Sequence, residues 1–316
     1  MGVPIVETKN LKKYFKVPKG LLHAVDDVSM VINQNETLGV VGESGCGKST
    51  LGRVLLGLLE ATSGEMLFNG ESIFDGRGRK KTNIYSEMQM IFQDPFTSLN
   101  PRLSIRDLIA EPIIVRKIIK DPNQIRERVL ELMDVVGLSR RYVNTYPHEL
   151  DGGRRQRVGI ARALALDPKF IVCDEPVSAL DVSIQAQILN LIMDLQEKNG
   201  LAYMFITHNL CVVKHISTNI MVMYMGKVVE YSDKRQLFEK QLHPYSQALL
   251  AAIPIPEIQP NRERTILTGE VSNPINPKPG CRFAPRCKHV TEKCTARDIP
   301  LIEVETGRKV ACTLYM

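Results

Sequence analysis

The chain has 316 residues, 44% of them hydrophobic and 24% charged, and a formal net charge of +6 at pH 7. That length suits one large domain with an appendage, or two domains. There is no run of 18 apolar residues and no apolar core segment at the N-terminus, which excludes a membrane-spanning helix and a secretion signal and predicts a cytoplasmic protein. The positive charge is spread along the chain, as is typical of solvated lysines and arginines.

The N-terminal part predicts short strands around a glycine-rich motif. Residues 5–9, 25–32 and 37–41 are alternating or continuous apolar runs, as expected for strands, and residues 51–59 predict a helix. Just before that helix, residues 42–50 have the sequence G-E-S-G-C-G-K-S-T. This is the P-loop spacing, in the strand–turn–helix context that the motif requires.

The motif predicts a phosphate-binding site. Glycines let backbone N–H groups turn inward, and the positive N-terminus of the following helix adds to the cradle. We expect Lys48 to reach the β- and γ-phosphates of a nucleotide and the Ser49 hydroxyl to ligate Mg²⁺. The residues predicted to contact the nucleotide in this loop are Gly42, Ser44, Gly45, Cys46, Gly47, Lys48, Ser49 and Thr50.

The middle of the chain changes from strand to helix. Residues 66–68 and 88–92 predict strands, with a Gly/Arg/Lys-rich surface loop at 74–83 between them. From 104 to 141 the apolar spacing becomes helical, most clearly over 121–138. We therefore expect a helical insertion in an α/β core.

Polar groups then follow predicted strands and turns. The pair Gly152-Gly153 opens a helix that runs to about residue 166, which is again an anion-binding arrangement. An apolar strand at 169–173 ends in Asp174 and Glu175, a pair that suits Mg²⁺ binding and the polarisation of a water molecule.

The last part of the core repeats this alternation. Residues 182–198 predict a helix, and the strand at 202–206 is followed by His208. Ligands bind at strand ends in α/β proteins, so a functional histidine is favoured over a structural one. Two more strands are expected at 219–224 and 227–231.

Composition changes after Ala252, where repeated prolines predict a tail of low regularity, and we place a domain boundary near residue 255. Four cysteines crowd the last 36 residues, whereas three others are scattered and are expected to pack as small hydrophobes. In a reducing compartment such a cluster indicates metal binding more than disulfides. The clustered cysteines are Cys281, Cys287, Cys294 and Cys312.

Taken in order, these motifs resemble those of ABC-transporter ATPase subunits, and within them the dipeptide/oligopeptide importers, nearest to the dipeptide "F" type. The resemblance covers essentially the whole chain, and the ordered combination is far more specific than a P-loop alone. The phrases that support it are residues 41–53, 92–95, 97–102, 176–183 and 243–250.

The resemblance implies an α/β fold with three parts. A P-loop ABC ATPase core, with a RecA-like mixed sheet and an antiparallel β subdomain, would span residues 1–255. A helical subdomain at about 94–165 would be inserted in it and would dock on a membrane subunit. A small irregular Cys-rich extension would occupy residues 256–316.

The resemblance also implies roles for single residues. Phe15 would stack on adenine, with Tyr14 as the alternative; without the resemblance, an ordinary half-buried strand aromatic is at least as plausible. Gln93 would touch Mg²⁺ or the attacking water, Glu175 would be the general base, and His208 would contact the γ-phosphate. The implied catalytic set is Lys48, Gln93, Glu175 and His208, and the implied Mg²⁺ set is Ser49, Gln93 and Asp174.

One segment departs from the family pattern. Where the family signature is Leu-Ser-Gly-Gly-Gln, this chain has Leu-Asp-Gly-Gly-Arg at 150–154. In the family this segment meets the γ-phosphate held by the opposite subunit, and an ionised Asp151 only accepts hydrogen bonds and would repel that phosphate. This favours an asymmetric heterodimer in which the site completed by Asp151 hydrolyses ATP poorly. The residues expected at the dimer interface are Asp151, Gly152, Gly153, Arg154 and Asp181.

The tail cysteines have the spacing C-x5-C-x6-C-x17-C. This resembles the pattern that holds a [4Fe–4S] cluster in some peptide-importer ATPases. Four thiolates suit an iron–sulfur cluster or tetrahedral zinc, and the absence of C-x2-C pairs favours the cluster over a zinc ribbon. A tail without metal is the third possibility.

The resemblance therefore implies an ATPase that binds ATP and Mg²⁺ and powers peptide import at the cytoplasmic face of the cell membrane. Its partners would be a second ABC ATPase subunit, two transmembrane permease subunits and, indirectly, an extracytoplasmic peptide-binding protein. An importer of nickel or another small solute is the alternative, and a soluble ABC ATPase that acts on nucleic acid is a remote one. Against nucleic acid, the chain has no concentrated basic patch.

Overall fold

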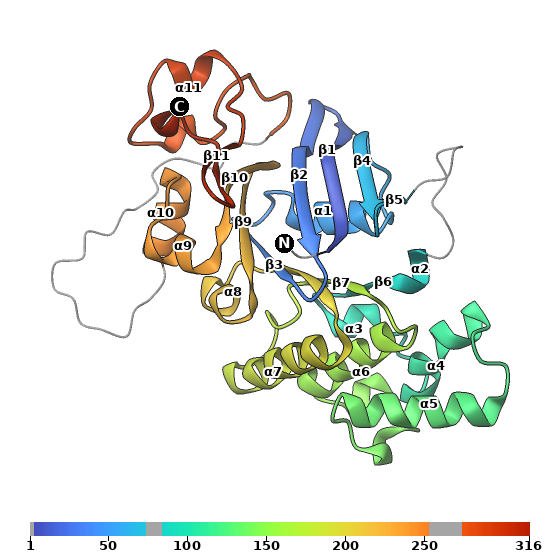
Figure 1. Ribbon diagram of the computed structural model, residues 1–316. Helices are drawn as coiled ribbons and strands as arrows, with labels where there is room; N and C mark the ends of the chain where they lie inside the picture. The colour runs from blue at the N-terminus through green and yellow to red at the C-terminus, as the bar shows by residue number, and fades with distance from the viewer. Residues whose placement is uncertain (1–2, 74–83, 253–273) are drawn as a thin grey trace. The chain divides into compact units, whose positions relative to one another are not determined.

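The computed structural model describes residues 3–73, 84–252 and 274–316 (Figure 1). The predicted loop at 74–83 and the boundary near 255 lie outside these residues. The chain divides into two compact units, which are described separately. The first, here called the helical unit, comprises Met1–Ile5, Asn33–Asn35 and Glu71–Met204. The second, here called the P-loop unit, comprises Val6–Ile32, Glu36–Gly70 and Phe205–Met316.

The P-loop unit contains an antiparallel arrangement of long strands. β1 (Pro4–Val17) lies between β2 (Gly20–Asn33) and β4 (Ser63–Phe68). β1 and β4 are antiparallel, with Val6 opposite Phe68. β1 extends eight residues beyond the strand predicted at 5–9. Its lysine-rich second half lacks an apolar pattern, but β1 is hydrogen-bonded to β2 as well as to β4. Tyr14 and Phe15 are therefore strand residues.

A mixed sheet forms the second layer of this unit (Figure 1). β3 (Thr37–Val41) is buried along its whole length and pairs in parallel with β9 (Asn219–Tyr224). β10 (Lys227–Asp233) pairs antiparallel with β9 on its other side. The tail, which was expected to be irregular, adds β12 (Arg308–Val310) to β10 and β11 (Ile302–Glu305) to β12.

Short helices complete the P-loop unit. α1 begins at Lys48, three residues before the predicted start, because Gly47 caps it in a left-handed conformation. α1 ends at Leu55. The other helices of this unit are α8 (Leu210–Ile216), α9 (Lys234–Glu239), α10 (Pro244–Ala251), η3 (Ala284–Arg286), α11 (Lys293–Ala296) and η4 (Thr313–Tyr315).

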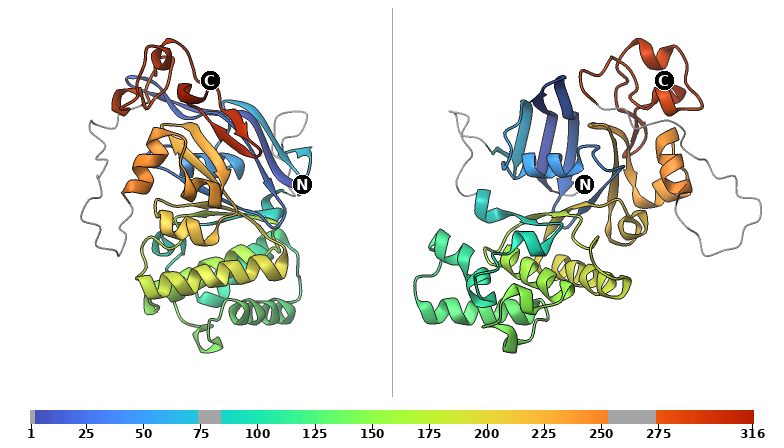
Figure 2. Two further views of the ribbon diagram at one scale, coloured as in Figure 1. Left: turned by 60° about the vertical axis from the view of Figure 1, so that its left-hand side comes forward. Right: turned by 180° about the vertical axis from the view of Figure 1, so that it is seen from behind.

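The helical unit confirms the predicted insertion. Its strands β6 (Met88–Ile91) and β7 (Phe170–Asp174) are parallel neighbours, and the helices from α3 to α6 lie between them in sequence. Figures 1 and 2 show α4 to α7 gathered together, and α6 contacts α4, α5 and α7. The helices are α2 (Ile84–Glu87), α3 (Pro95–Ser98), α4 (Ile105–Arg116), α5 (Pro122–Val135), η1 (Arg140–Tyr142), η2 (Pro147–Glu149), α6 (Gly152–Leu164) and α7 (Val182–Asn199).

Local signals explain these helix boundaries. The Asp121 side chain accepts from the Asn123 amide at 3.1 Å, and Pro122 occupies the first turn, where its missing N–H costs nothing. Two short strands occur where the chain passes from one unit to the other in sequence: β5 (Glu71–Ser72) begins the last segment of the helical unit, and β8 (Ala202–Ile206) contains its end. Within the described part of the chain, no helix is long and apolar enough to cross a membrane.

Candidate nucleotide-binding and catalytic site

The P-loop conformation depends on glycine at two positions. Gly47 has φ 103°, and a Cβ there would lie 1.9 Å from the Ala24 carbonyl oxygen. Gly42 has φ 151°, and its Cβ would lie 2.2 Å from the Met223 carbonyl oxygen. A side chain at either position would clash with backbone atoms. The glycines of the P-loop motif are therefore required by close backbone packing as well as by their positive φ angles.

The lysine of the motif is buried and lies over the loop. Lys48 is 5% exposed, and its Nζ donates to the carbonyl oxygens of Gly42 at 2.8 Å and Glu43 at 3.0 Å. Burial raises the pKa of the neighbouring Cys46 thiol, so this cysteine is a packed neutral group. An ammonium held by loop carbonyls can exchange onto phosphate oxygens without a large movement of the backbone.

Glu43, which sequence reasoning did not single out, is held from three sides. Its amide donates to the Tyr245 hydroxyl at 2.8 Å, and its carboxylate accepts from Arg286 at 2.9 and 3.2 Å. Its carbonyl is one of the two that receive Lys48. The partner of Glu43 is one of two arginines that lie between Cys281 and Cys287. The sequence shows these arginines but gives no indication of which residues they contact.

The two candidate adenine-stacking residues have different surroundings. Tyr14 stacks on His23 with ring centroids 3.8 Å apart, and its hydroxyl donates to Asp26 at 2.5 Å. Phe15 has the Lys13 ammonium 4.9 Å from its ring centroid. Neighbouring side chains on a strand point to opposite faces, so the two rings cannot share one role.

In the helical unit, two of the predicted catalytic residues meet. Gln93 Nε2 donates to Glu175 Oε2 at 3.2 Å. Asp174, at the end of β7, is 3% exposed. Glu175 has φ 48°, and its carbonyl accepts from the Ser178 amide at 3.3 Å. A non-glycine residue in the left-handed region is strained, and such strain is common where a turn must direct a functional side chain.

His208 belongs to the P-loop unit, together with Lys48 and Ser49. It is exposed and follows β8 by two residues. The Thr207 amide before it donates to the Val40 carbonyl at 3.2 Å, and the Asn209 amide after it donates to the Thr207 hydroxyl at 3.0 Å. The turn that presents the histidine is thus tied to the strand that leads into the P-loop.

Asp151 has a structural role that explains how it can replace serine. It is the N-cap of α6, and its Oδ1 accepts from the Arg154 amide at 2.8 Å. Its Oδ2 is 2.5 Å from Arg154 Nη1, so the unusual arginine pairs with the unusual aspartate. Serine and aspartate are both good N-caps. The two departures from the signature therefore form one local ion pair.

The two signature glycines and Asp181 also lie in the helical unit. A Cβ at Gly153 would lie 2.6 Å from Ile184 Cγ2, so the start of α6 packs closely against the start of α7. Asp181 is the N-cap of α7 and accepts from the Ile184 amide at 2.9 Å. The residues predicted for the dimer interface are therefore neighbours in this unit.

The four tail cysteines are free thiols that line one small apolar cavity, together with His243, His289 and Phe283. Within the described ranges, no three or more His, Cys, Asp or Glu side chains are grouped closely enough to hold a metal ion.

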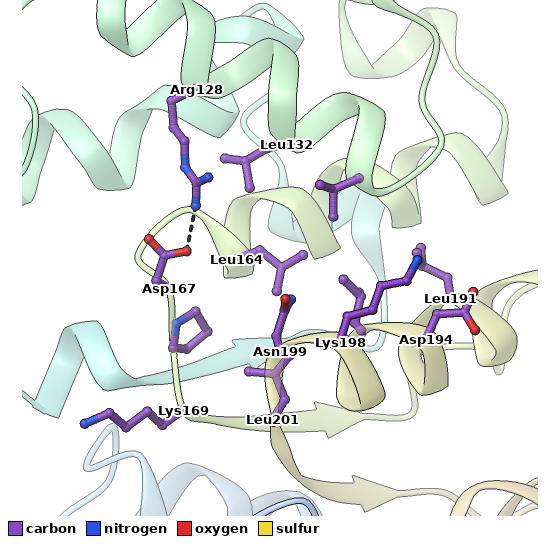
Figure 3. Close-up of a pocket in the computed structure, with 13 residues that line it drawn as sticks. Arg128, Leu132, Leu164, Asp167, Lys169, Leu191, Asp194, Lys198, Asn199 and Leu201 are labelled. Carbon is purple, nitrogen blue, oxygen red and sulfur yellow. Dashed lines mark hydrogen bonds and ion pairs between the residues drawn. The ribbon is translucent and has the colours of Figure 1, made fainter.

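A different pocket, of about 480 Å³, lies in the helical unit (Figure 3). It is lined by residues of α5, α6 and α7, and an ion pair of 2.6 Å between Arg128 and Asp167 spans one side. None of the residues predicted for nucleotide, Mg²⁺ or thiolate-bound metal line it. Pocket size therefore does not identify the catalytic residues of this protein.

Comparisons with known proteins agree with this geometry. Residues 25–178 match the family model "ABC transporter", and residues 229–294 match "Oligopeptide/dipeptide transporter, C-terminal region". The oligopeptide transport ATP-binding protein OppF of Bacillus subtilis is 54% identical over 84% of this chain and 87% of its own length. The dipeptide transport ATP-binding protein DppF of Haemophilus influenzae is 46% identical over 98% of this chain and 97% of its own length.

Solved structures agree as well. A dimeric ATP-binding cassette in a post-hydrolysis state bound to ADP and Pi has a TM-score of 0.66 and 29% identity, covering 73% of this chain and 99% of that one. CbiO1 from Clostridium perfringens, part of an ABC transporter complex, has a TM-score of 0.66 and 26% identity over 75% of this chain and 92% of that one. The chain is an ABC-type ATPase and belongs to the family of ATP-binding subunits of oligopeptide/dipeptide ABC transporters.

Proposed function

We propose that this chain hydrolyses ATP to power the import of di- and oligopeptides, at the cytoplasmic face of the cell membrane. The observation that carries the proposal is that an ABC ATPase match and a match to the peptide-transporter C-terminal region occur in one chain. The second region separates peptide transporters from ABC ATPases in general. The partners of this chain in the transporter would be two permease subunits and a second ATPase subunit.

The chemistry is attack of water on the γ-phosphate of ATP. The P-loop amides and Lys48 would bind the phosphates, and Ser49 and Asp174 would hold the Mg²⁺ that accompanies the nucleotide. Glu175 takes a proton from the attacking water, Gln93 helps to place that water, and His208 contacts the γ-phosphate. The hydrogen bond between Gln93 and Glu175 supports this pairing of roles.

The test is Glu175→Gln in the assembled transporter, with ATP binding and hydrolysis measured separately. Hydrolysis should fall at least a hundredfold, within the range of a lost general base, while ATP binding is retained. Peptide uptake in a strain that depends on this transporter should stop. A variant that still hydrolyses ATP normally would refute the assignment of the base, and uptake of nickel instead of peptide would refute the cargo.

An asymmetric heterodimer is the second part of the proposal. The site that contains this chain's P-loop would be completed by a partner with an ordinary signature, whereas the partner's P-loop would face Asp151. The pair with Arg154 reduces the negative charge but supplies no hydroxyl donor. Asp151→Ser should therefore raise turnover at the partner's site in the assembled transporter, and unchanged or lower turnover would contradict the proposal.

For the tail we propose a [4Fe–4S] cluster held by Cys281, Cys287, Cys294 and Cys312, within an extension that begins near residue 256. A cluster here would be a structural staple for a proline-rich segment with little apolar surface to bury. Anaerobically purified protein should be brown and contain about four irons per chain. Cys287→Ser should remove the iron, with Cys211→Ser, an exposed cysteine outside the cavity, as the control. Colourless protein with one zinc would contradict the cluster.

A further inference from the structure

Two arginines of the tail lie beside the first two clustered cysteines. Arg282 follows Cys281, and Arg286 precedes Cys287. Both side chains are only 7% exposed, and each is paired with an acidic residue far away in sequence. All of these residues belong to the P-loop unit, where the tail adjoins β10 (Figure 1).

Arg286 reaches the P-loop itself. Its two Nη atoms donate to the two carboxylate oxygens of Glu43, at 2.9 and 3.2 Å, and Nη1 also lies 3.4 Å from the Tyr224 hydroxyl. A bidentate pair fixes orientation as well as distance. The main-chain carbonyl of Glu43 also accepts from Lys48 Nζ, so Arg286 and the lysine of the P-loop bond the same residue.

Arg282 does not bond the P-loop directly but bonds residues that contact it. It pairs with Asp26, the acceptor of the Tyr14 hydroxyl, and donates to the Met225 carbonyl. The next residue, Gly226, donates its amide to the Cys46 carbonyl of the P-loop at 2.8 Å. The arginine therefore supports the turn on which the P-loop rests.

A buried aromatic residue lies between the two arginines in the sequence. Phe283 is 2% exposed and packs against Tyr224 and Tyr245, with ring centroids 5.3 and 5.4 Å apart. The same apolar cluster includes Val41, which immediately precedes the P-loop, and contacts Cys281 and Cys287. Because Phe283 is packed in this cluster, the backbone that carries the two arginines is held in place by core packing.

We propose that Arg282, Phe283 and Arg286, here called the tail clamp, are positioning residues that hold the P-loop in its phosphate-binding conformation. The nucleotide affinity of this subunit then depends on the contacts of the tail clamp, and the bound nucleotide in turn stabilises these contacts, since coupling between two sites is reciprocal. This goes beyond the proposed function, which gives the tail no role in nucleotide binding. The alternative is that the arginines serve only to fold the tail.

The test uses the full-length chain and a fluorescent ATP analogue with Mg²⁺, titrated without permease partners. Arg286→Gln should weaken binding about tenfold, because affinity falls in proportion to the fraction of loops in the competent conformation. Glu43→Gln should do the same, and the double variant should be no weaker than either single one, since both remove one contact. Arg286→Lys, which keeps the charge, should recover part of the loss.

Arg308→Gln is the matched control. Arg308 is a buried tail arginine, 4% exposed, which bonds the Lys240 carbonyl and does not contact the P-loop. The Arg308→Gln substitution should leave the nucleotide affinity within twofold of that of the wild type. Equal weakening by Arg308→Gln and Arg286→Gln would overturn the proposal, because it would mean that any damage to the tail has the same effect.

Hydrogen exchange of peptides from 281–316 then separates positioning from folding. Nucleotide should slow exchange of these peptides in the wild type and much less in Glu43→Gln, whose tail sequence is intact. If Arg286→Gln unfolds the tail, Glu43→Gln decides: unchanged affinity overturns the clamp, and weakened affinity supports it. Failure of the proposed import function would appear separately, as nucleotide-dependent tail protection without peptide uptake.

Discussion

Glu230 provides a quantitative test of how the tail is attached to the P-loop unit. This carboxylate on β10 is fully buried, at 0% exposure. Its two oxygens accept from the amides of Leu242 and His243, both at 2.9 Å, and Arg308 approaches to 3.8 Å. One side chain therefore connects β10 to the segment that begins α10 and to an arginine of the tail.

The change Glu230→Gln keeps the shape but replaces one acceptor with a donor. One buried amide then loses its partner, which costs about 1–3 kcal/mol. The weakened contact with Arg308 adds to this, but less than the 3–5 kcal/mol typical of a broken buried pair, because the distance is long and Arg308 has other partners. We therefore expect the local opening free energy to fall by about 3 kcal/mol, or roughly a hundredfold in the opening equilibrium.

Hydrogen exchange by mass spectrometry is the appropriate assay, because a chain with two compact units need not unfold in one step. Exchange of a peptide that contains Leu242 and His243 should accelerate roughly a hundredfold in Glu230→Gln. Glu239→Gln makes the same charge change on an exposed residue of α9 and should change opening by less than about 0.5 kcal/mol. Acceleration of less than about threefold at residue 242 or 243 would refute the reasoning.

Further predictions concern single contacts. Tyr245→Phe removes the acceptor of the Glu43 amide but keeps the ring, so it should cost about 1–2 kcal/mol in urea unfolding of the P-loop unit; no measurable loss would mean that water replaces the hydroxyl. Asp151→Ser should leave thermal stability unchanged, whereas Asp151→Ala should lose about 1 kcal/mol with the cap; equal melting temperatures would contradict the capping role. Burial alone would raise the pKa of Asp26, but hydrogen bonds from Tyr14 and the positive charge of Arg282 outweigh it, and the pKa is lowered. The stability advantage over Asp26→Asn should therefore be complete above about pH 4 and disappear as the pH falls through the lowered folded pKa; a constant difference at acidic pH would contradict this.

Much of the fold followed from local sequence patterns. The strand, glycine loop and helix around Lys48 were located by spacing, and the helical insertion by the change of period after residue 104. Boundaries were less exact where local and long-range effects compete. β1 continues through a lysine-rich stretch, and it pairs with β2 on one side as well as with β4 on the other. The tail strand β12 pairs with the edge of β10, and β11 then pairs with β12.

The candidate catalytic residues could be named from the sequence because the motifs that contain them, taken in order, resemble those of a known family. The strain at Glu175, the cap formed by Asp151 and its pairing with Arg154 were not visible there. The first depends on backbone angles. The other two depend on which of several available partners an exposed side chain takes at a helix start.

Sequence spacing alone was enough to locate the phosphate-binding motif, most of the strands and helices between residues 37 and 231, and the cysteine cluster, since these depend on patterns within a few residues. The contacts between the tail and the P-loop, in contrast, could be found only in the folded structure. Arg286 and Glu43 are 243 residues apart, and Arg282 and Asp26 are 256 apart. No periodicity links residues at such separations. An arginine becomes buried only if folding brings it a carboxylate, because an unpaired buried charge is too costly to keep.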